Sequence, residues 1–413
     1  MTVVAPDLAN RPERLWVVSE LYYPEETSTG YYLTRIAEGL TDDFDVKALC
    51  GQPNYSARGT RAPKRETHNG VDIFRVAGTT LNKNVILFRL LNMITLSVST
   101  FVRAVVSFRS GDNVLVVTTP PSLPFVVAAA ALLRGAHYTL LIHDNYPEIL
   151  FAVGKSTDNS TLAHVLNFAN RWLYKNTSKI VAVGRDMKVL LERKTAGLET
   201  SIVVIPNWAE LETVQPEPRE TNALLTELGL AEKFVLLYAG NMGHPNDLET
   251  IVSAAKHLAD EPHFHFIFLG TGVKEPWLRR LVADFGLTNI TILRPKPRSE
   301  QIVFLNACDI ALVSLVKKMW GVSMPSRTYN ILAAGKPILA LAESYSELSL
   351  VIDDDQVGWH VQPGEVEELV SHIHRIYDER EQLNEIGARA RQAALANYTL
   401  ELAVGRYRDA LTN

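Results

Sequence analysis

Short apolar runs alternate with segments of helical periodicity along this chain, and that alternation limits the possible folds more than any other feature. Val, Ile and Leu follow one another in these runs instead of alternating with polar residues, which is typical of strands buried on both faces of a parallel sheet. Segments between them, such as 30–40 and 162–176, repeat apolar residues at helical spacing. We therefore predict βαβ units, with first-half strands at 14–19, 45–49, 71–76, 113–118, 138–143, 179–184 and 202–207.

The series stops after Trp208 and begins again at 234, and the stretch between is polar and holds two prolines. A length of 413 residues suits two domains of the usual ~150 residues each. We predict an α/β fold of two doubly wound domains in tandem, 1–208 and 209–395, with a C-terminal helix over 396–413 that packs back on the first domain. The second domain is expected to have strands at 234–240, 264–270, 290–293, 310–315 and 337–342 and helices at 246–259, 275–286 and 325–334.

Charge and cysteine content exclude some classes of protein. Lys and Arg total 41 against 46 Asp and Glu, so the chain lacks the basic field that binding to duplex nucleic acid needs. Its two cysteines, Cys50 and Cys308, lie in apolar stretches, which indicates buried thiols in a reducing compartment. The N-terminus has neither a cationic start nor an apolar signal core. We expect a cytoplasmic protein that binds no nucleic acid.

The longest apolar stretch, 85–108, leaves two interpretations open. Arg89, Asn92 and Arg103 interrupt it, and its uninterrupted part is shorter than the ~20 residues that cross a bilayer. We favour a long helix packed on the N-terminal sheet. The alternative is a helix that rests on a membrane surface, which would place the protein at the inner face of the plasma membrane.

Ligands of open α/β sheets bind at the carboxyl ends of the strands, so the loops there are the candidate sites. The strand ending at 240 runs into Gly240, Asn241, Met242 and Gly243, and Asn246 or Asp247 can cap the helix that follows. Glycines let the backbone approach an anion, and free N–H groups at a helix start donate to it. This is a candidate phosphate site, although a turn without a ligand would have the same sequence.

A second candidate anion site lies in the segment 321–337. Pro325 is placed near the first helical position, and Ser326, Arg327 and Thr328 follow it. An Arg fork and hydroxyls beside free N–H groups suit a phosphate. The alternative is a surface Arg on a capped helix. Two such sites in one domain indicate the two ends of a diphosphate.

In the first domain, His143, Asp144 and Glu148 follow a central strand at its carboxyl end. Three polar groups so close together at that edge favour a site over a capped turn. We predict that His143 and Asp144 are catalytic and that Glu148 binds the acceptor, the molecule that would receive a transferred group. The basic loop 51–70 is either a solvated loop or a second acceptor contact, through Asn54, Tyr55 and Arg58.

Several segments together resemble glycosyltransferase family 4, in the branch that builds bacterial surface polysaccharides. They are LLYAGNMG, LGTGVKEPWLRRL, the Pro295/Pro297 turn before ACDIALVSL, PSRTYNILAAGKPILAL followed by Ser346-Glu347, and GWHVQPG. The resemblance implies a GT-B fold, with two Rossmann-like domains facing each other across a cleft. It also implies retaining transfer from a nucleotide-sugar, with no metal and no other cofactor.

The resemblance also assigns donor contacts. The positions where the family has a pair of glutamates are occupied here by Val322 and Asn330. The family's first diphosphate-binding cations are replaced by Asn241 and a polar turn. Arg327 then remains as the cation for the diphosphate, with Asn330 and Glu347 as acceptors for ribose or sugar hydroxyls. Further contacts implied are Gly30 at the donor phosphates and the backbone of Arg294, Pro295 and Lys296 at a uracil base.

We therefore expect a retaining, metal-independent hexosyltransferase that uses a nucleotide-diphosphate sugar, UDP-linked and with glucose as the first candidate. The acceptor would be a sugar or a lipid-linked sugar in polysaccharide synthesis, with peripheral membrane contact. Two alternatives share the architecture: a nucleotide-sugar epimerase, which needs acid and base groups on both faces of the sugar, and a non-catalytic nucleotide-sugar-binding protein. Asp353, Asp354 and Asp355 are expected in a solvated turn without a metal.

Overall fold

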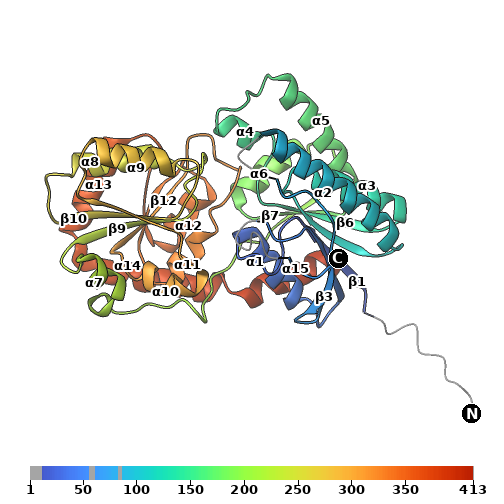
Figure 1. The fold of residues 1–413 in the computed structure, drawn as a ribbon, viewed down its shortest axis with the longest axis horizontal. Helices are drawn as coiled ribbons and strands as arrows, with labels where there is room; N and C mark the ends of the chain where they lie inside the picture. The colour runs from blue at the N-terminus through green and yellow to red at the C-terminus, as the bar shows by residue number, and fades with distance from the viewer. Residues whose placement is uncertain (1–11, 55–60, 82–85, 413) are drawn as a thin grey trace, which may run out of the picture.

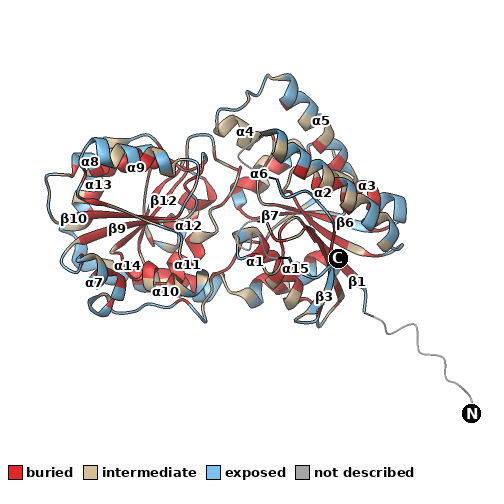
Figure 2. Ribbon diagram, in the orientation of Figure 1, coloured by how far each residue is buried: buried red, intermediate tan, exposed pale blue. Residues whose placement is uncertain are grey.

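Two parallel sheets, one in each half of the chain, organise the molecule into two lobes that lie side by side (Figure 1). The structure is a computed structural model and describes residues 12–54, 61–81 and 86–412. The expected GT-B arrangement of two tandem α/β domains is confirmed. Strand interiors are buried on both faces in both lobes (Figure 2), as their continuous apolar sequences require.

The sheet of the first domain has the order β3-β4-β2-β1-β5-β6-β7-β8 among the described residues. All neighbours are parallel except β3 and β4, which pair antiparallel. The order changes direction between β1 and β5, which makes that point the place for a ligand at the carboxyl edge. The strands are β1 (Arg14–Ser19), β2 (Asp45–Cys50), β3 (Arg65–His68), β4 (Val71–Arg75), β5 (Asn113–Val117), β6 (His137–Ile142), β7 (Lys179–Ala182) and β8 (Ser201–Val204).

Helices cover both faces of this sheet (Figure 1). One face carries α2, α3 and α5, with α2 packed on α3 and α3 on α5, while α1 lies on the other face. Helix α2 is long and apolar enough to cross a membrane by length and composition, yet it connects two strands of one sheet and packs there. The helices are α1 (Ser28–Gly39), α2 (Ile86–Ser107), α3 (Leu123–Arg134), α4 (Glu148–Ala152), α5 (Thr161–Asn176) and α6 (Arg185–Lys194).

The sheet of the second domain has the order β11-β10-β9-β12-β13-β14, all parallel. Its direction changes between β9 and β12, so the loops after these two strands flank the expected ligand position. The strands are β9 (Phe234–Ala239), β10 (Phe264–Leu269), β11 (Ile290–Leu293), β12 (Ile310–Ser314), β13 (Ile338–Leu341) and β14 (Gly358–Val361). The helices are α7 (Ala223–Leu228), α8 (Leu248–His257), α9 (Glu275–Asp284), α10 (Gln301–Leu305), α11 (Arg327–Ala333), α12 (Glu347–Asp355), α13 (Val366–Asp378) and α14 (Leu383–Asn397).

The end of the chain returns to the first domain. Helix α14 packs on α11 and α12 of the second domain, and the next helix, α15 (Leu400–Thr412), packs on α1. Arg408 Nε donates to Asp43 Oδ2 at 2.6 Å. The side chain of Val404 occupies the space where a Cβ on Gly39 would lie, so a larger residue at 39 would push the two helices apart.

Two local expectations need correction. Asp353 to Asp355 do not form a turn but are the last residues of α12, and the chain leaves the helix at Gln356, which caps it with a left-handed φ of 51°. Pro325 lies outside α11, whose first residue is Arg327. Both cysteines are buried and free, as expected.

Candidate active site

The domains meet where the loop after β6 reaches the loop after β12. The main-chain N–H of Asn145 donates to the carbonyl oxygen of Val322 at 2.9 Å, and its side-chain Nδ2 donates to that of Gly321 at 2.7 Å. Asn145 is fully buried, so these bonds form away from water, where they are strong. The carboxyl edge of the first sheet is therefore joined directly to the second domain.

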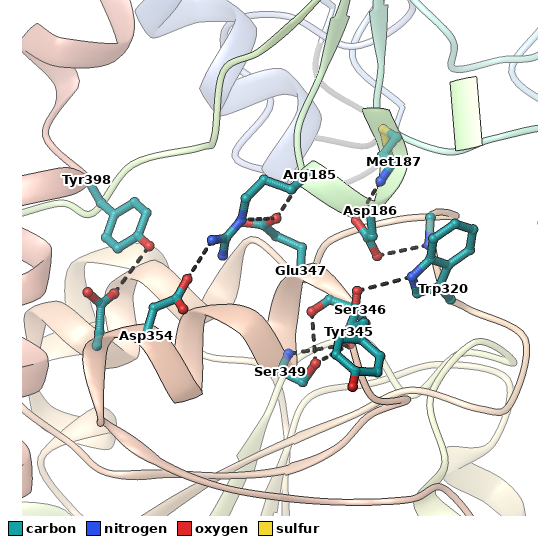
Figure 3. Close-up of polar contacts among 12 residues, drawn as sticks. Arg185, Asp186, Met187, Trp320, Tyr345, Ser346, Glu347, Ser349, Asp354 and Tyr398 are labelled. Carbon is teal, nitrogen blue, oxygen red and sulfur yellow. Dashed lines mark hydrogen bonds and ion pairs between the residues drawn. The ribbon is translucent and has the colours of Figure 1, made fainter. Parts of the chain in front are cut away.

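A second set of contacts runs from the start of α6 to α12 and the loop after β12 (Figure 3). Glu347 Oε2 accepts from the main-chain N–H and Nε of Arg185, at 2.6 and 3.0 Å, and Arg185 Nη1 contacts Asp354 at 2.5 Å. Asp186 Oδ2 accepts from the N–H of Gly321 at 2.9 Å. Burial raises the pKa of Glu347, while Arg185 acts against that rise. Both bonds from Arg185 end on Oε2 of Glu347 and form an ion pair between the domains, while the predicted contact of Glu347 with a donor hydroxyl stays a prediction.

Arg327 lies at the carboxyl end of β9, against the glycine-rich loop. Its Nη1 donates to the carbonyl oxygen of Ala239 at 3.1 Å and its Nη2 to Asn246 Oδ1 at 2.8 Å, and the guanidinium lies 4.7 Å from the centre of the Tyr238 ring. A Cβ on Gly240 would collide with Nη1, so a larger residue there would displace the guanidinium. No carboxylate of the described residues pairs with this cation. A half-buried guanidinium without a counter-charge suits an anion.

The glycine-rich loop is held by the loop after β10. The N–H of Met242 donates to the carbonyl oxygen of Thr271 at 2.9 Å, and its carbonyl oxygen accepts from the N–H of Lys274 at 3.0 Å. The Met242 side chain is fully buried, so this residue shapes the loop through its packing and its two main-chain bonds. The carbonyl oxygen of Asn241 accepts from Tyr238 and Asn246, and a Cβ on Gly243 would lie 2.9 Å from the Asn241 amide.

The start of α1 meets the start of α11 across the interface. Ser28 Oγ and Ser326 Oγ are 2.5 Å apart. Thr27 caps α1 by accepting from the N–H of Gly30 at 3.4 Å, and a Cβ on Gly30 would lie 2.9 Å from the carbonyl oxygen of Glu25. The partial positive charge of the α1 N-terminus thus adds to the full positive charge of Arg327 on the neighbouring helix.

His143 and Asp144 directly follow β6, and Asp144 contacts Ser323 in the loop after β12. Burial lowers the pKa of His143 to about 4, and Nε2 of this imidazole is buried without a partner among the described residues. Burial raises the pKa of Asp144 to about 6, against a hydrogen bond with the Ser323 side chain. At pH 7 the imidazole is therefore neutral and the carboxyl group is ionised. Both groups can accept a hydrogen bond from a hydroxyl and orient it, but both are weak bases.

Asn330 does not present a free side chain to a ligand. Its Oδ1 accepts from the N–H of Glu210 at 2.9 Å, and its Nδ2 donates to Glu210 Oε1 at 3.0 Å and to Gln301 Oε1 at 2.6 Å. Arg298 pairs with the same Glu210 carboxylate. Asn330 therefore joins the segment between the domains to α10 and α11 in this structure, and its predicted ribose contact stays a prediction.

The remaining donor candidates lie in two places. Thr328 is fully buried, and its hydroxyl has no partner among the described residues. Arg294, Pro295 and Lys296 follow β11 at the same carboxyl edge as the glycine-rich loop, and Lys296 Nζ pairs with Glu300 at 2.6 Å.

Two of the acceptor candidates, Asn54 and Glu148, lie in the described part of the chain and have different partners. Asn54 binds the loop after β1, through its N–H to Glu25 at 2.5 Å and its Nδ2 to Glu20 at 3.0 Å. Glu148 pairs with Lys194 at 2.6 Å and lines a hollow of about 400 Å³ together with Phe168. The predicted contacts of Tyr55 and Arg58 lie outside the described residues.

Comparison with known families agrees with this architecture. Residues 28–208 match the family described as "Glycosyl transferase 4-like domain", and residues 225–393 match "Glycosyl transferases group 1". The chain is a GT4-type glycosyltransferase.

Relatives of this glycosyltransferase match it over nearly the whole length. A protein described as "Probable glycosyltransferase WbjE" from Pseudomonas aeruginosa is 29% identical, over 95% of this chain and 96% of its own. The "Putative colanic acid biosynthesis glycosyl transferase WcaI" of Escherichia coli is 26% identical, over 86% of this chain and 89% of its own. Both names connect such sequences with glycosyl transfer, and the second with colanic acid biosynthesis.

Solved structures of the same fold include a sucrose-phosphate synthase from Thermosynechococcus elongatus, with a TM-score of 0.77 and 14% identity over 96% of this chain and 98% of its own. The Anabaena protein HepE in complex with UDP and glucose has a TM-score of 0.72 and 15% identity, over 97% of this chain and 100% of its own. At these identities the likeness concerns the GT-B fold.

Sequence reasoning missed the residues that join the two domains of the glycosyltransferase. Asn145 directly follows the two predicted catalytic residues, so its position after β6 was a usable signal. Arg185 and Asp186 begin a helix after β7, yet nothing local distinguishes them from ordinary first-turn residues. Within the parts of the chain that the structure describes, no three His, Cys, Asp or Glu side chains group as a metal site.

Proposed function

We propose that this glycosyltransferase moves a hexosyl group, with glucose as the first candidate, from a UDP-linked donor to a sugar or lipid-linked sugar acceptor in polysaccharide synthesis. The observation that carries the proposal is the guanidinium of Arg327, held against Gly240 without a carboxylate partner among the described residues and close to the start of α1. The complex of HepE with UDP and glucose supports the choice of donor in a protein of the same fold.

We propose that the donor diphosphate is neutralised by Arg327 and the α1 N-terminus, without a metal ion. Retention fits the groups at the end of β6. The bond from the anomeric carbon to phosphate breaks, a bond to the acceptor oxygen forms on the same face, and the acceptor proton passes to the departing phosphate. His143 and Asp144 then position the sugar or acceptor hydroxyl and stabilise charge.

The proposed reaction is tested by incubating the protein with UDP-glucose and other nucleotide-sugars, with and without sugar acceptors. Transfer releases UDP only when an acceptor is added, and NMR of the product shows whether the anomeric configuration is retained. An isomeric nucleotide-sugar in place of UDP would indicate an epimerase, and binding without any turnover would indicate a sensor. We propose that the reaction takes place in the cytoplasm.

A further inference from the structure

Helix α2 turns an apolar stripe outward. Its members recur every three or four residues, which puts them on one side of the helix. Each is 40–70% exposed, and the stripe extends about 28 Å at 1.5 Å rise per residue. They are Leu87, Leu91, Ile94, Val98, Val102 and Val106.

The side of α2 that faces the domain is partly polar. Asn92, Ser97 and Thr100 are all buried. Asn92 exchanges two hydrogen bonds of 3.0 Å with the backbone of Leu81, and Ser97 Oγ lies 2.8 Å from Ser122 Oγ at the start of α3. These bonds fix the rotation of the helix. Leu96 and Ala104 are buried on this side as well, so α2 is apolar on both sides. A surface helix ordinarily has its apolar stripe on the inward side alone, so the outward stripe calls for an apolar partner.

Neighbouring helices on the same face of the sheet extend the apolar surface (Figure 1). The end of α3 exposes Leu132 and Leu133, and α5 exposes a further series that includes Phe168 at 81%. We call the exposed residues of α2, α3 and α5 the α2 face. On α5 they are Leu162, Val165, Phe168 and Trp172.

The α2 face is cationic and free of acids. The sequences of α2, α3 and α5 contain no Asp or Glu. None of their cations forms an ion pair with a carboxylate of the described residues. Apolar side chains among unpaired cations match an interfacial surface that binds anionic lipid. The cations are Arg89, Arg103, Arg134, Arg171 and Lys175.

We infer that the α2 face lies on the surface of an anionic bilayer, with its aliphatic side chains in the interfacial layer. A two-fold dimer through this face would set the same acid-free surface against its own copy, so unpaired cations would gather in one interface. The bilayer offers apolar depth and negative charge together. The hollow beside Glu148 is lined by Phe168 and Arg171 of this face, so a lipid-linked acceptor would reach it from the membrane. This last link rests on the proposed function, whereas the membrane contact does not.

The test is co-sedimentation of the full chain with vesicles, without donor or acceptor. We expect binding to phosphatidylcholine vesicles that contain phosphatidylglycerol, weaker binding to phosphatidylcholine alone, and loss of binding at high salt. The triple variant Ile94→Gln, Val98→Gln, Val102→Gln should bind about tenfold more weakly or worse. All three side chains are at least half exposed, so folding should be kept, and circular dichroism checks it.

Two further variants sharpen the result. The pair Val273→Gln and Phe285→Gln removes equally exposed apolar groups from the second domain and should bind like the original chain. The pair Arg89→Gln and Arg171→Gln should weaken binding to the anionic vesicles only. The inference is overturned if the chain does not bind anionic vesicles, if the triple variant binds equally well, or if the chain is a dimer that the triple variant makes monomeric. Vesicle binding by a chain that lacks transfer activity would refute the proposed function alone.

Discussion

Replacing Arg327 by Ala removes the guanidinium that we place at the donor diphosphate. A hydrogen bond to a charged group contributes about 1.5–3 kcal/mol. At about 1.4 kcal/mol per factor of ten, the affinity for UDP should fall roughly tenfold to hundredfold. Isothermal titration calorimetry with UDP measures the change directly, without a need for the acceptor.

The same substitution also leaves two acceptors without their donor, the carbonyl oxygen of Ala239 and Oδ1 of Asn246. This should destabilise the fold by about 1–3 kcal/mol, so a thermal melt must show that the variant is folded under the conditions of the titration. Arg327→Lys keeps the charge and loses the two-pronged geometry, and we expect intermediate affinity from it. Arg279→Ala removes an exposed Arg paired with Glu275 on α9 and is the matched control.

Gly240→Ala perturbs the same site while Arg327 stays in the sequence. Its Cβ would collide with Nη1 of Arg327 and displace the guanidinium while leaving the charge in the protein. The affinity for UDP should again fall. If folded Arg327→Ala binds UDP as tightly as the original chain, Arg327 does not hold the diphosphate and our placement of the donor fails.

Three further predictions concern the metal and the end of β6. EDTA should leave turnover unchanged, and restoration of a lost activity by magnesium or manganese would show that the metal-free proposal is wrong. Ala at His143 or Asp144 should lower kcat about 10²-fold with UDP affinity nearly intact; a lower melting temperature with normal kcat per folded molecule would instead indicate a structural role. The folded pKa of Asp144 is raised to about 6, so the free energy of unfolding falls as this group ionises between about pH 4 and 6. The folded pKa of His143 is lowered to about 4, so the free energy of unfolding rises between about pH 4 and 6.5. Asp144→Asn keeps only the His143 effect, so urea unfolding should show its stability rising by up to about 3 kcal/mol over that range, more steeply than in the original chain; equal slopes would contradict the two pKa values.

Local sequence patterns were enough to predict most elements of both sheets. A strand in a parallel sheet is apolar throughout, and a turn with glycines follows it, so the runs 14–19 and 234–240 correspond to β1 and β9 within a residue. The same logic located the loops at the carboxyl ends of the strands, whereas the contact of Arg327 with the glycine-rich turn joins residues 88 positions apart. The strands and turns depend on neighbours along the chain, so local patterns were sufficient to predict them.

The partners of the candidate side chains depend on contacts between residues far apart along the chain. Glu347 and Asn330 had the chemistry of hydroxyl acceptors, but folding gave them partners 162 and 120 residues away, Arg185 and Glu210. The bond from Asn145 to Gly321 spans 176 residues. The orientation of α2 was likewise undecided, because an apolar helix can turn either side to a sheet. Its rotation is fixed by the hydrogen bonds of Asn92 and Ser97, whose partners only the folded chain brings within reach.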